Sequence, residues 1–564
     1  MRGGLFVVGG ESDKIRRSFG GLMNRWITLV CGLALAVAPA WSDEGHQHAH
    51  ALTLQEVGSV HFLTSCDRSM WTSFNRAVAL LHSFQYEQAR FAFMDVSIHD
   101  PGCAMAQWGI AMSHFHGLWD NGDMAAGRKA LQKAGELANR VRSTTAREKA
   151  YIAALEEIYV EDGKDKYAHA QAFEQKMGEL QAAYPDDSEA AIFHALSLAI
   201  SAPKTDKTFS NQEKCGEILE PLFAKQPHHP GIAHYIIHCY DNPVLAEKGL
   251  GAARAYAKIA PASAHANHMP SHIFTRVGSW DESIASNMRS AELAAAAEKG
   301  STNGEARDQR LHAMDYLEYA YLQSGRIKQA KAVLDEMSGL PAASGLTLTG
   351  NYATAAIPAR YSLELGKWED ASKLEAPTDA VPWAQAITWM AVGVGSARSG
   401  DLQRAGQAEQ KLASLRDATN KLENIYWANQ IEVQRREVVA WTAQQSGKAE
   451  DAVSAMHSAV ELEESMDKSP VTPGAVTPAR EMLAQLLMLQ KRPQEALTEY
   501  EAVLKAAPNR FNALYGAATA ADAAGDASTA GRYFHKLLES AGGEERPELA
   551  EARKKTVAAS QGPQ

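Results

Sequence analysis

The sequence predicts an all-α solenoid, in which pairs of antiparallel helices stack one after another along the chain. Three observations lead to this prediction. Alanine followed four positions later by an aromatic residue recurs at a spacing of 34 residues, as at Ala496 and Ala530. Glycine followed two positions later by an apolar residue recurs between helical apolar patterns, and the alternating pattern of a β-strand is almost absent.

The repeated unit has the spacing of a tetratricopeptide repeat. An early copy lies at Ala89, Phe93 and Pro101, and further copies follow near the C-terminus. Glycines mark the turn between the two helices of a unit at Gly278, Gly325, Gly366, Gly400, Gly447 and Gly525. We expect about ten to twelve units, wound into a right-handed superhelix whose concave groove is lined by the first helix of each unit.

The composition fits a large folded protein. Of 564 residues, 45% are hydrophobic and 22% are charged, which allows a large buried core. The net charge of -11 argues against a basic surface, so we expect no nucleic-acid partner. A solenoid groove is a binding surface, and we therefore expect a protein or peptide partner there.

The N-terminus has the layout of an export signal. Arg25 precedes an apolar run, residues 27–38, and the small residues Ala38-Pro39-Ala40 follow as a cleavage site. The run is too short to cross a bilayer, so we expect no membrane span in the mature chain. A buried N-terminal helix is the alternative, and Arg16-Arg17 leaves the twin-arginine export route open. We expect an exported protein, periplasmic or secreted.

Interruptions of the repeat pattern divide the chain into segments. The clearest internal interruption runs from Lys468 to Pro478 and contains three prolines. The expected segments are a signal peptide with its upstream leader (1–42), a polar, histidine-containing lead-in (43–69), N-terminal repeats with a histidine-rich groove (70–344), central repeats (345–467), a linker (468–476), C-terminal repeats (477–545) and a tail (546–564).

Four cysteines remain after the expected cleavage, namely Cys66, Cys103, Cys215 and Cys239. An oxidising compartment permits disulfides, and four cysteines allow three pairings. Cys66 and Cys103 precede the first helices of adjacent units, so we expect a disulfide between them. A thiolate metal site at this pair is the alternative.

Histidines are concentrated in the first part of the chain. Of the 20 histidines, all but His457 and His535 lie at or before His312. At helical spacing, the densest groups fall on two faces. These faces carry His234, His238 and Asp241, and then His265, His268 and His272.

The repeat register brings these two faces together. His268 lies 34 residues after His234, and His272 lies 34 residues after His238, so each pair holds equivalent positions in adjacent units. Packed helices lie about 8–10 Å apart, which lets four imidazoles surround one metal ion. Asp241 either adds a ligand or orients a histidine from behind. We expect zinc, copper or iron, among which the sequence does not choose.

The next unit adds weaker metal-ligand candidates, His312 and Asp315, on the corresponding face. The alternative is a layer of neutral imidazoles that hydrogen-bond to one another and hold two units in register without a metal. Pro270 leaves the local geometry open. The helix either kinks there or begins there, and a late start would leave His265 and His268 in a loop.

Three segments resemble a family of exported bacterial tetratricopeptide-repeat proteins. They are residues 100–109 (DPGCAMAQWG), 234–238 (HYIIH) and 268–274 (HMPSHIF). The resemblance covers essentially the whole mature chain. It implies the solenoid fold and export, and it assigns no activity, cofactor or catalytic residue.

We expect a binding protein whose groove holds a peptide, a protein partner or a small ligand around the histidine site. One alternative is a metal-dependent hydrolase of the zinc type, in which Asp241, Asp315 or Glu318 acts as general base. The segment from His234 to His238 is not HExxH, and the sequence has neither a P-loop nor a GxSxG motif, so we favour binding over catalysis. The other alternative is an assembly scaffold with structural histidines.

Overall fold

Helices form the regular structure of this protein. The computed structural model describes residues 52–118, 122–163, 165–203, 205–299, 304–341, 346–543 and 546–560, and these ranges contain no β-strand. The prediction of an all-α fold is therefore confirmed. Within the same ranges, no helix is both long enough and apolar enough to cross a membrane. The expected export segment (1–42) lies outside the described residues.

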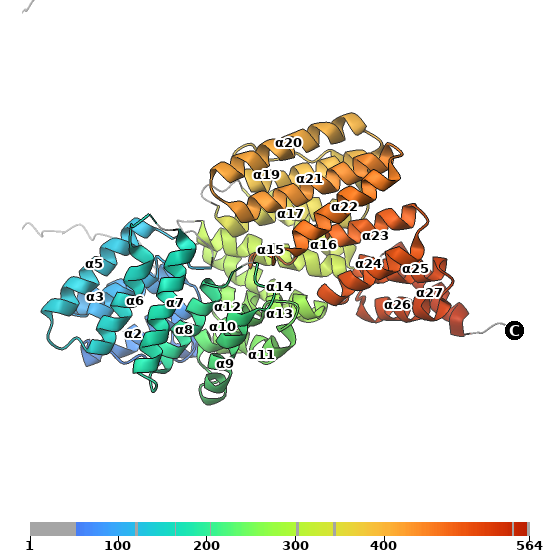
Figure 1. Cartoon of the computed structure of the whole chain (residues 1–564). Coiled ribbons are helices and arrows are strands. Elements are labelled where there is room, and N and C mark those ends of the chain that lie inside the picture. Colours follow the sequence, from blue (N-terminus) through green and yellow to red (C-terminus); the bar gives the residue numbers. More distant parts are fainter. Residues whose placement is uncertain are drawn as a thin grey trace, which may run out of the picture. The chain divides into compact units, whose positions relative to one another are not determined.

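The helices of the first half follow one another through the stack, and Figure 1 colours them from blue to green. Two short 3-10 helices, η1 (Arg68–Met70) and η2 (Ala246–Gly249), lie among them. The α-helices are α1 (Leu54–Val57), α2 (Trp71–His82), α3 (Tyr86–His99), α4 (Ala104–Met112), α5 (Met124–Arg140), α6 (Ala146–Tyr159), α7 (Lys166–Ala183), α8 (Ser188–Ile200), α9 (Ser210–Lys225), α10 (Pro230–Tyr240), α11 (Leu250–Ile259), α12 (Ala264–His268), α13 (Pro270–Val277) and α14 (Trp280–Glu298).

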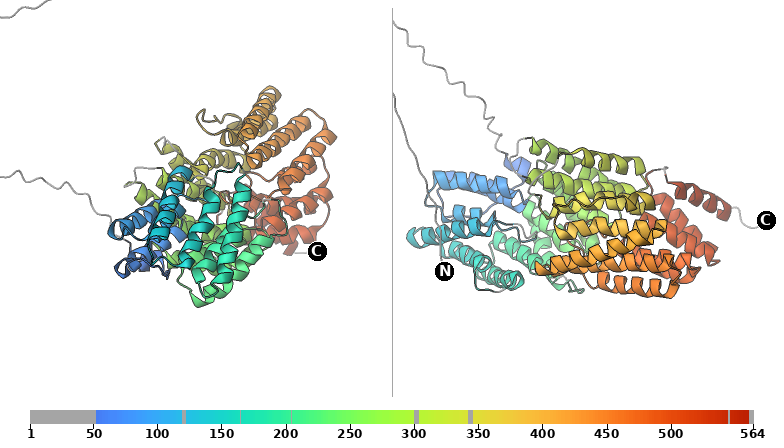
Figure 2. Two further views of the ribbon diagram at one scale, coloured as in Figure 1. Left: turned by 60° about the vertical axis from the view of Figure 1, so that its left-hand side comes forward. Right: turned by 90° about the horizontal axis from the view of Figure 1, so that it is seen from above.

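The second half continues in the same way, and Figure 2 shows the helices from two further sides. They are α15 (Glu305–Gln323), α16 (Ile327–Gly339), α17 (Leu348–Glu364), α18 (Trp368–Ser372), α19 (Pro382–Ser399), α20 (Leu402–Lys421), α21 (Ile425–Gln445), α22 (Ala449–Glu464), α23 (Ala479–Leu489), α24 (Pro493–Ala506), α25 (Phe511–Ala523), α26 (Ala527–Ser540) and α27 (Pro547–Ser560).

Successive helices pack against one another, as α14 does against α15 and α21 against α22. Every glycine that marks a predicted turn has a left-handed backbone, with φ between 63° and 91°. This conformation suits glycine because it has no side chain, so the predicted turns are confirmed. In two units without such a glycine, Phe84 and Lys491 take the same conformation, with φ of 51° and 59°.

The alanine–aromatic spacing reflects a close approach between helices. A Cβ atom on Gly109 would lie 2.4 Å from the ring of Phe93, and one on Gly516 would lie 2.3 Å from the ring of Tyr500. Both aromatic residues belong to the repeat pattern read from the sequence. In each case the aromatic ring of one helix covers a glycine of the next, so the glycine has no room for a larger side chain.

The C-terminal units return to the middle of the solenoid. The backbone oxygen of Asn509 accepts a hydrogen bond from Trp280 Nε1 (3.0 Å), and its side-chain nitrogen donates to the backbone oxygen of Gly278 (3.1 Å). The backbone N–H of Phe511 donates to Gln323 Oε1 at 2.9 Å. These contacts join residues 188 to 231 positions apart, so the second half of the described solenoid closes back onto residues of its middle.

Arg510 anchors this closing contact. Its guanidinium is fully buried and forms ion pairs with the carboxylates of Glu364 and Glu481, the latter at 2.6 Å. Arg510 also donates to the hydroxyl of Tyr319 at 3.3 Å. Burial raises the pKa of Glu481, and the charge of Arg510 opposes that rise. The closure therefore depends on a buried charged group.

Two segments expected to lie outside the repeats carry buried apolar residues. In the lead-in, the ring of Phe62 packs against Trp108 and Tyr151, with centroid distances of 5.6 and 5.1 Å. The segment expected as a tail contains α27, which packs on α26 and buries Leu549 and Ala552. These two residues are three positions apart and share one helix face, which explains why this segment packs.

The expected linker lies within a non-helical strap, residues 465–478, which joins α22 to α23. The backbone N–H of Ser469 donates to the hydroxyl of Tyr426 at 2.7 Å. The hydroxyl of Tyr316 donates to the backbone oxygen of Thr472 at 2.8 Å. Because the strap is held by side chains of α15 and α21, it forms part of the groove and is not a free connection.

Two disulfides hold the N-terminal units. They join Cys66 to Cys103 and Cys215 to Cys239, with Cα separations of 4.8 and 6.1 Å. The first joins the segment before α2 to the residue that precedes α4, and the second joins α9 to α10. The second pairing is one that the sequence leaves undetermined. It fixes α10, which carries two of the candidate histidines.

Removing the first disulfide should lower the free energy of unfolding. The bond closes a loop with a sequence separation of 37 residues, and restricting the unfolded chain in this way is worth about 2–4 kcal/mol. Urea unfolding of the parent and of a Cys66→Ala/Cys103→Ala variant, both under non-reducing conditions, measures the difference. An unchanged urea midpoint would argue against the bond.

Candidate metal centre

Six histidines from neighbouring helices converge in this part of the fold. Five of the side chains are more than nine-tenths buried, and His238 is half-buried. They are His234 and His238 on α10, His265 and His268 on α12, His272 on α13 and His312 on α15. Since α13 and α15 end at two of the predicted turn glycines, they are the first helices of their units, as the sequence predicts.

Local sequence determines where α10 and α12 begin. Pro230 occupies the first turn of α10, and His229 caps the helix by accepting a hydrogen bond from the backbone N–H of Ile232 (3.4 Å). Ser263 caps α12 by accepting from the backbone N–H of Ala266 at 3.1 Å. Each cap sets where its helix begins, so His234 on α10 and His265 on α12 lie within the first two turns.

Pro270 begins a helix of its own. Helix α12 ends at His268, and α13 starts at Pro270 with Met269 in helical conformation between them. The structure thus combines the two alternatives left open by the sequence, because the proline starts a helix while His265 and His268 remain helical. The bend does not separate the histidines, since His268 and His272 still meet.

The first triad consists of His234, His238 and His265. The Nε2 atom of His234 lies 3.0 Å from that of His238 and 3.0 Å from that of His265. One nitrogen from each ring lies within 4.8 Å of the others. Phe84 covers this triad, with its ring centroid 4.4 Å from that of His234. Three imidazoles therefore direct nitrogens at one point.

The second triad consists of His268, His272 and His312. The Nε2 atoms of His268 and His272 lie 3.0 Å apart, and one nitrogen of each of the three rings lies within 4.8 Å of the others. The ring centroid of His312 lies 4.2 Å from that of His268. His312 is thus a full member of a triad, whereas its sequence position made it a weaker candidate.

Hydrogen bonds on the far side of the rings fix the orientation of three histidines. His234 Nδ1 lies 2.6 Å from the backbone oxygen of His82, and His272 Nδ1 lies 2.9 Å from the carboxylate of Asp241. His268 Nδ1 lies 2.7 Å from Asn287 Oδ1. Because all three partners are acceptors, each Nδ1 carries the proton and each Nε2 carries a lone pair.

The contact between His268 and His272 brings two lone pairs together. Both rings hold their proton on Nδ1, yet their Nε2 atoms face each other at 3.0 Å. The amide of Asn287 is oriented by a hydrogen bond from its nitrogen to the backbone oxygen of Ser283 (2.8 Å), which turns its oxygen to His268. Two facing lone pairs repel unless a positive charge lies between them.

A proton is a poor candidate for that charge at neutral pH. Burial lowers the pKa of every triad imidazole, and the pKa of His234 falls to about 3. Neighbouring imidazoles lower the pKa of His265 and His312 further. Six neutral rings whose nitrogens meet in two groups are a donor set that suits a transition-metal ion.

A third histidine cluster, which the sequence analysis did not find, has the opposite arrangement. The carboxylate of Glu189 accepts hydrogen bonds from His82 Nε2 and His229 Nε2, both at 2.9 Å. His82 Nδ1 lies 2.9 Å from the hydroxyl of Tyr235. All four ring nitrogens of this cluster have partners, counting the bond from the backbone of Ile232. It is a hydrogen-bonded support beneath the first triad.

Asp241 does not belong to either triad. Its carboxylate accepts hydrogen bonds from His272 Nδ1 (2.9 Å), Arg276 Nε (2.8 Å) and Lys468 Nζ (2.8 Å). These partners hold its pKa well below the ordinary value in spite of burial. Of the two roles considered from the sequence, the structure places Asp241 in the one that orients a histidine from behind.

Asp315 and Glu318 face a different partner. Both carboxylates lie against the buried guanidinium of Arg360 on α17, at 2.7 and 2.9 Å. Burial raises the pKa of Asp315, and it raises that of Glu318 to about 8. Among the described residues, neither carboxylate groups with the histidine nitrogens. Their expected roles as metal ligand or general base therefore find no support in the geometry.

The grouping of the rings differs from the repeat register. The sequence pairs His234 with His268 and His238 with His272, whereas each triad combines two rings from one helical face with one from a neighbouring helix. Across the triads, the ring centroids of His238 and His272 lie 6.3 Å apart, and so do those of His265 and His268. The expected single cradle is thus replaced by two adjoining three-histidine sites.

A small cavity reaches the first triad. It has a volume of about 40 Å³ and is lined by His238 and Asp241 together with Lys468 of the strap. His238, the half-buried member of the six, therefore borders this cavity. The strap forms one wall of the cavity.

Comparisons with known proteins find similarity in structure only. No protein-family model matches the chain, and no curated protein matches it. A crystal structure of yeast Tom70 matches 81% of this chain and 96% of its own, with 12% identity and a TM-score of 0.31. Human IFIT1, titled as a dimer with m7Gppp-AAAA, matches 82% and 95%, with 11% identity and a TM-score of 0.33. The APC/C hetero-tetramer Cut9-Hcn1 matches 86% and 95%, with 14% identity and a TM-score of 0.26. With scores this low, we base no functional inference on these matches.

Proposed function

We propose that this chain is an exported metal-binding protein with a tetratricopeptide-type fold, which holds two transition-metal ions at the two histidine triads. The observation that carries the proposal is the contact between His268 and His272, in which the lone pairs of the two Nε2 atoms face each other. Two nitrogens at about 2.0–2.1 Å from one ion lie about 3 Å from each other. The spacing of the Nε2 atoms in both triads fits that requirement.

The donor set favours zinc or copper. Neutral imidazoles without thiolate ligands suit both metals, and copper(II) binds most tightly in the usual order of divalent ions. Open iron sites of the common type combine two histidines with a carboxylate. Among the described residues, the histidine triads include no carboxylate, so iron is the weakest of the three metals expected from the sequence.

The two ions would be close neighbours. The ring distances of 6.3 Å between the triads are shorter than the 6.5 Å between His238 and His265 within the first triad. Three protein ligands leave at least one open position on a four-coordinate ion. A small ligand would bind at such an open position, which makes the centre suited to ligand binding.

Export is part of the proposal. Disulfides persist in oxidising compartments and are rare in the cytosol, and the described part of this chain contains two. They support the export signal read at residues 1–42. A periplasmic or secreted location would expose the triads to metal ions outside the cytosol.

A metal-dependent hydrolase is a weaker candidate. Its general base was expected among Asp241, Asp315 and Glu318, but Asp241 is engaged by Arg276 and Lys468, and the other two carboxylates face Arg360. A base must reach the proton that it removes, directly or through one water molecule. A pure scaffold would leave the facing lone pairs of the second triad without a stabilising cation.

Elemental analysis tests the two-site proposal. We expect two zinc or copper ions per chain after loading and desalting, one ion in a His238→Ala variant, one in a His312→Ala variant, and none in the double variant. Each substitution removes one of three ligands from a single triad, which leaves the other triad intact. The protein must carry no histidine tag.

His457→Ala is the matched control, because His457 is exposed on α22 and belongs to neither triad. It should retain both ions, and the circular dichroism of all variants should remain helical. A parent that takes up no metal would refute the proposal. Equal metal content in the parent and the double variant would refute it as well.

A further inference from the structure

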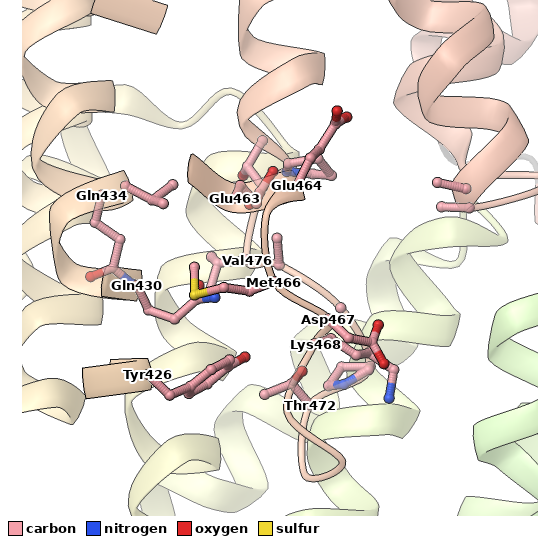
Figure 3. A pocket seen from close by; sticks show the side chains of 18 of the residues that line it. Tyr426, Gln430, Gln434, Glu463, Glu464, Met466, Asp467, Lys468, Thr472 and Val476 are labelled. Carbon is pink, nitrogen blue, oxygen red and sulfur yellow. The ribbon is translucent and has the colours of Figure 1, made fainter. Parts of the chain in front are cut away.

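A pocket of about 380 Å³ lies in the groove, apart from the histidine triads. Helices α17, α19 and α21 and the strap contribute to its wall. Figure 3 shows Tyr426, Gln430 and Gln434 along one side of this pocket, with Met466 and Thr472 of the strap across from them. The pocket is large enough for a side chain or a small organic molecule.

Among the described residues, three buried polar atoms of the pocket wall have no hydrogen-bond partner. These atoms are Glu437 Oε2, Gln434 Oε1 and Thr477 Oγ1. The side chain of Glu437 is only 2% exposed. A buried acceptor without a donor costs about 1–3 kcal/mol, more if it is charged. Gln434 Oε1 can only accept, and Glu437 Oε2 accepts when its carboxyl is ionised, so a ligand with N–H or O–H donors would satisfy both atoms.

The pocket is also acidic. Glu463 lies close enough to Glu437 for their charges to interact, and burial raises the pKa of Glu463 to about 7. Burial, and then the charge of Glu463, raise the pKa of Glu437 well above its usual range. Of the three basic side chains on the wall, Arg276 and Lys468 already pair with Asp241 at 2.8 Å, and the charge of Lys207 interacts with that of Asp467. A ligand that brings its own positive charge would therefore be favoured.

Aromatic and apolar groups complete the wall. Trp427 and Tyr352 contribute rings, and Met390 and Val476 contribute aliphatic surface. The ring of Trp427 is held in place by stacking on Trp383, with centroids 4.4 Å apart. Aromatic faces attract cations, and the aliphatic surface accommodates an apolar chain.

We propose that this pocket binds an alkylammonium or guanidinium group, with its N–H donors on Glu437 and Gln434 and its apolar stem against Trp427 and Met390. This chemistry has two sources, a free amine and the basic side chain of a lysine or arginine in a peptide. The triad histidines do not line the pocket, so the proposal stands apart from metal binding.

Calorimetric titration of the purified full chain with three ligands of equal chain length tests the chemistry. We expect n-butylammonium to bind at least tenfold more tightly than butyltrimethylammonium, which has no N–H donor, and than n-butanol, which has no charge. Comparison with Nα-acetyl-lysine amide distinguishes the sources. Tighter binding of the amide would indicate a peptide, and tighter binding of the free amine would indicate a small molecule.

Glu437→Gln keeps the size of the side chain and removes its ability to ionise when a cation binds, and we expect at least a tenfold loss of affinity for n-butylammonium. Glu461→Gln is the matched control, because Glu461 is exposed on α22 and does not line the pocket. It should bind as the parent does. Equal affinity for butanol and butylammonium in the parent would overturn the proposal, as would unchanged affinity in the Glu437→Gln variant. The parent comparison remains decisive even if that variant does not fold.

Discussion

Metal-free protein is expected to lose stability steeply as the pH falls below about 6.5, the ordinary pKa of histidine. The six triad imidazoles are neutral in the folded state because burial lowers their pKa, while in the unfolded chain they titrate normally. The unfolded chain therefore binds more protons. The stabilisation is fully present above the unfolded pKa and is lost as the pH falls toward the folded pKa, which for His234 is about 3.

The expected effect is large. Each such histidine contributes about 1 kcal/mol of loss between pH 6.5 and 5.5, so six contribute about 6 kcal/mol, comparable to the whole stability of many domains. Urea midpoints measured at pH 7.5, 6.5 and 5.5 in the presence of a chelator test this. A flat profile across that range would contradict neutral burial of the rings.

Two controls separate the triads from other titrating groups. His312→Asn should reduce the slope of the unfolding free energy against pH by the equivalent of one bound proton. His457→Asn, at an exposed position, should leave that slope unchanged. Saturating zinc should shift the loss of stability to lower pH, because the ion binds the folded, unprotonated rings and stabilises that state.

Arg510→Met should lower the free energy of unfolding by about 3–5 kcal/mol. The substitution keeps much of the apolar stem but leaves the carboxylates of Glu364 and Glu481 buried without their cation. Burial already raises the pKa of Glu481, so protonation relieves the unpaired charge. The difference between variant and parent should consequently narrow as the pH falls.

Urea unfolding at pH 7.5 measures the effect, and a second variant tests its cause. Arg510→Met combined with Glu364→Gln and Glu481→Gln should recover much of the loss, because no buried charge remains. Arg492→Met is the control. Arg492 pairs with Glu495 at the surface, where an ion pair is worth about 1 kcal/mol or less. Equal losses at Arg492 and Arg510 would contradict the explanation.

The helical repeats could be predicted from the sequence because their signals are local. The turn glycines, such as Gly278 and Gly325, and the aromatic residues Phe93 and Tyr500 each act within a few residues or on the next helix. The same local signals predicted that the histidines lie on the first helices of their repeat units. Repeat register predicted that the two histidine faces lie close together, but not how the six rings group.

The division into two triads could not be predicted in this way. It depends on how far α12 and α13 bend at Pro270 and on how α15 packs against α12, which are properties of the assembled stack. Asp315 and Glu318 pair with Arg360 and not with the histidine rings. Arg360 lies more than forty residues further along the chain, so no local pattern indicates this pairing. A single buried arginine gives no periodic signal.

The pocket and the strap were missed for a similar reason. Three prolines made the strap look like an independent linker, and only its contacts with Tyr316 and Tyr426 reveal that it lies in the groove. Glu437 looks like an ordinary helical glutamate in the sequence. Its burial follows from the neighbouring helices and the strap together.

The return of the C-terminal units to α13 and α14 imposes an order on folding during synthesis. N-terminal units emerge first and can pack on their neighbours one at a time. The hydrogen bond between Asn509 and Gly278 joins residues 231 positions apart, so it must wait for the last units. Ala506 and Ala507, next to Asn509, form part of the pocket wall. A nascent chain that ends before α24 would therefore contain most of its helices and both triads, yet would lack a complete pocket.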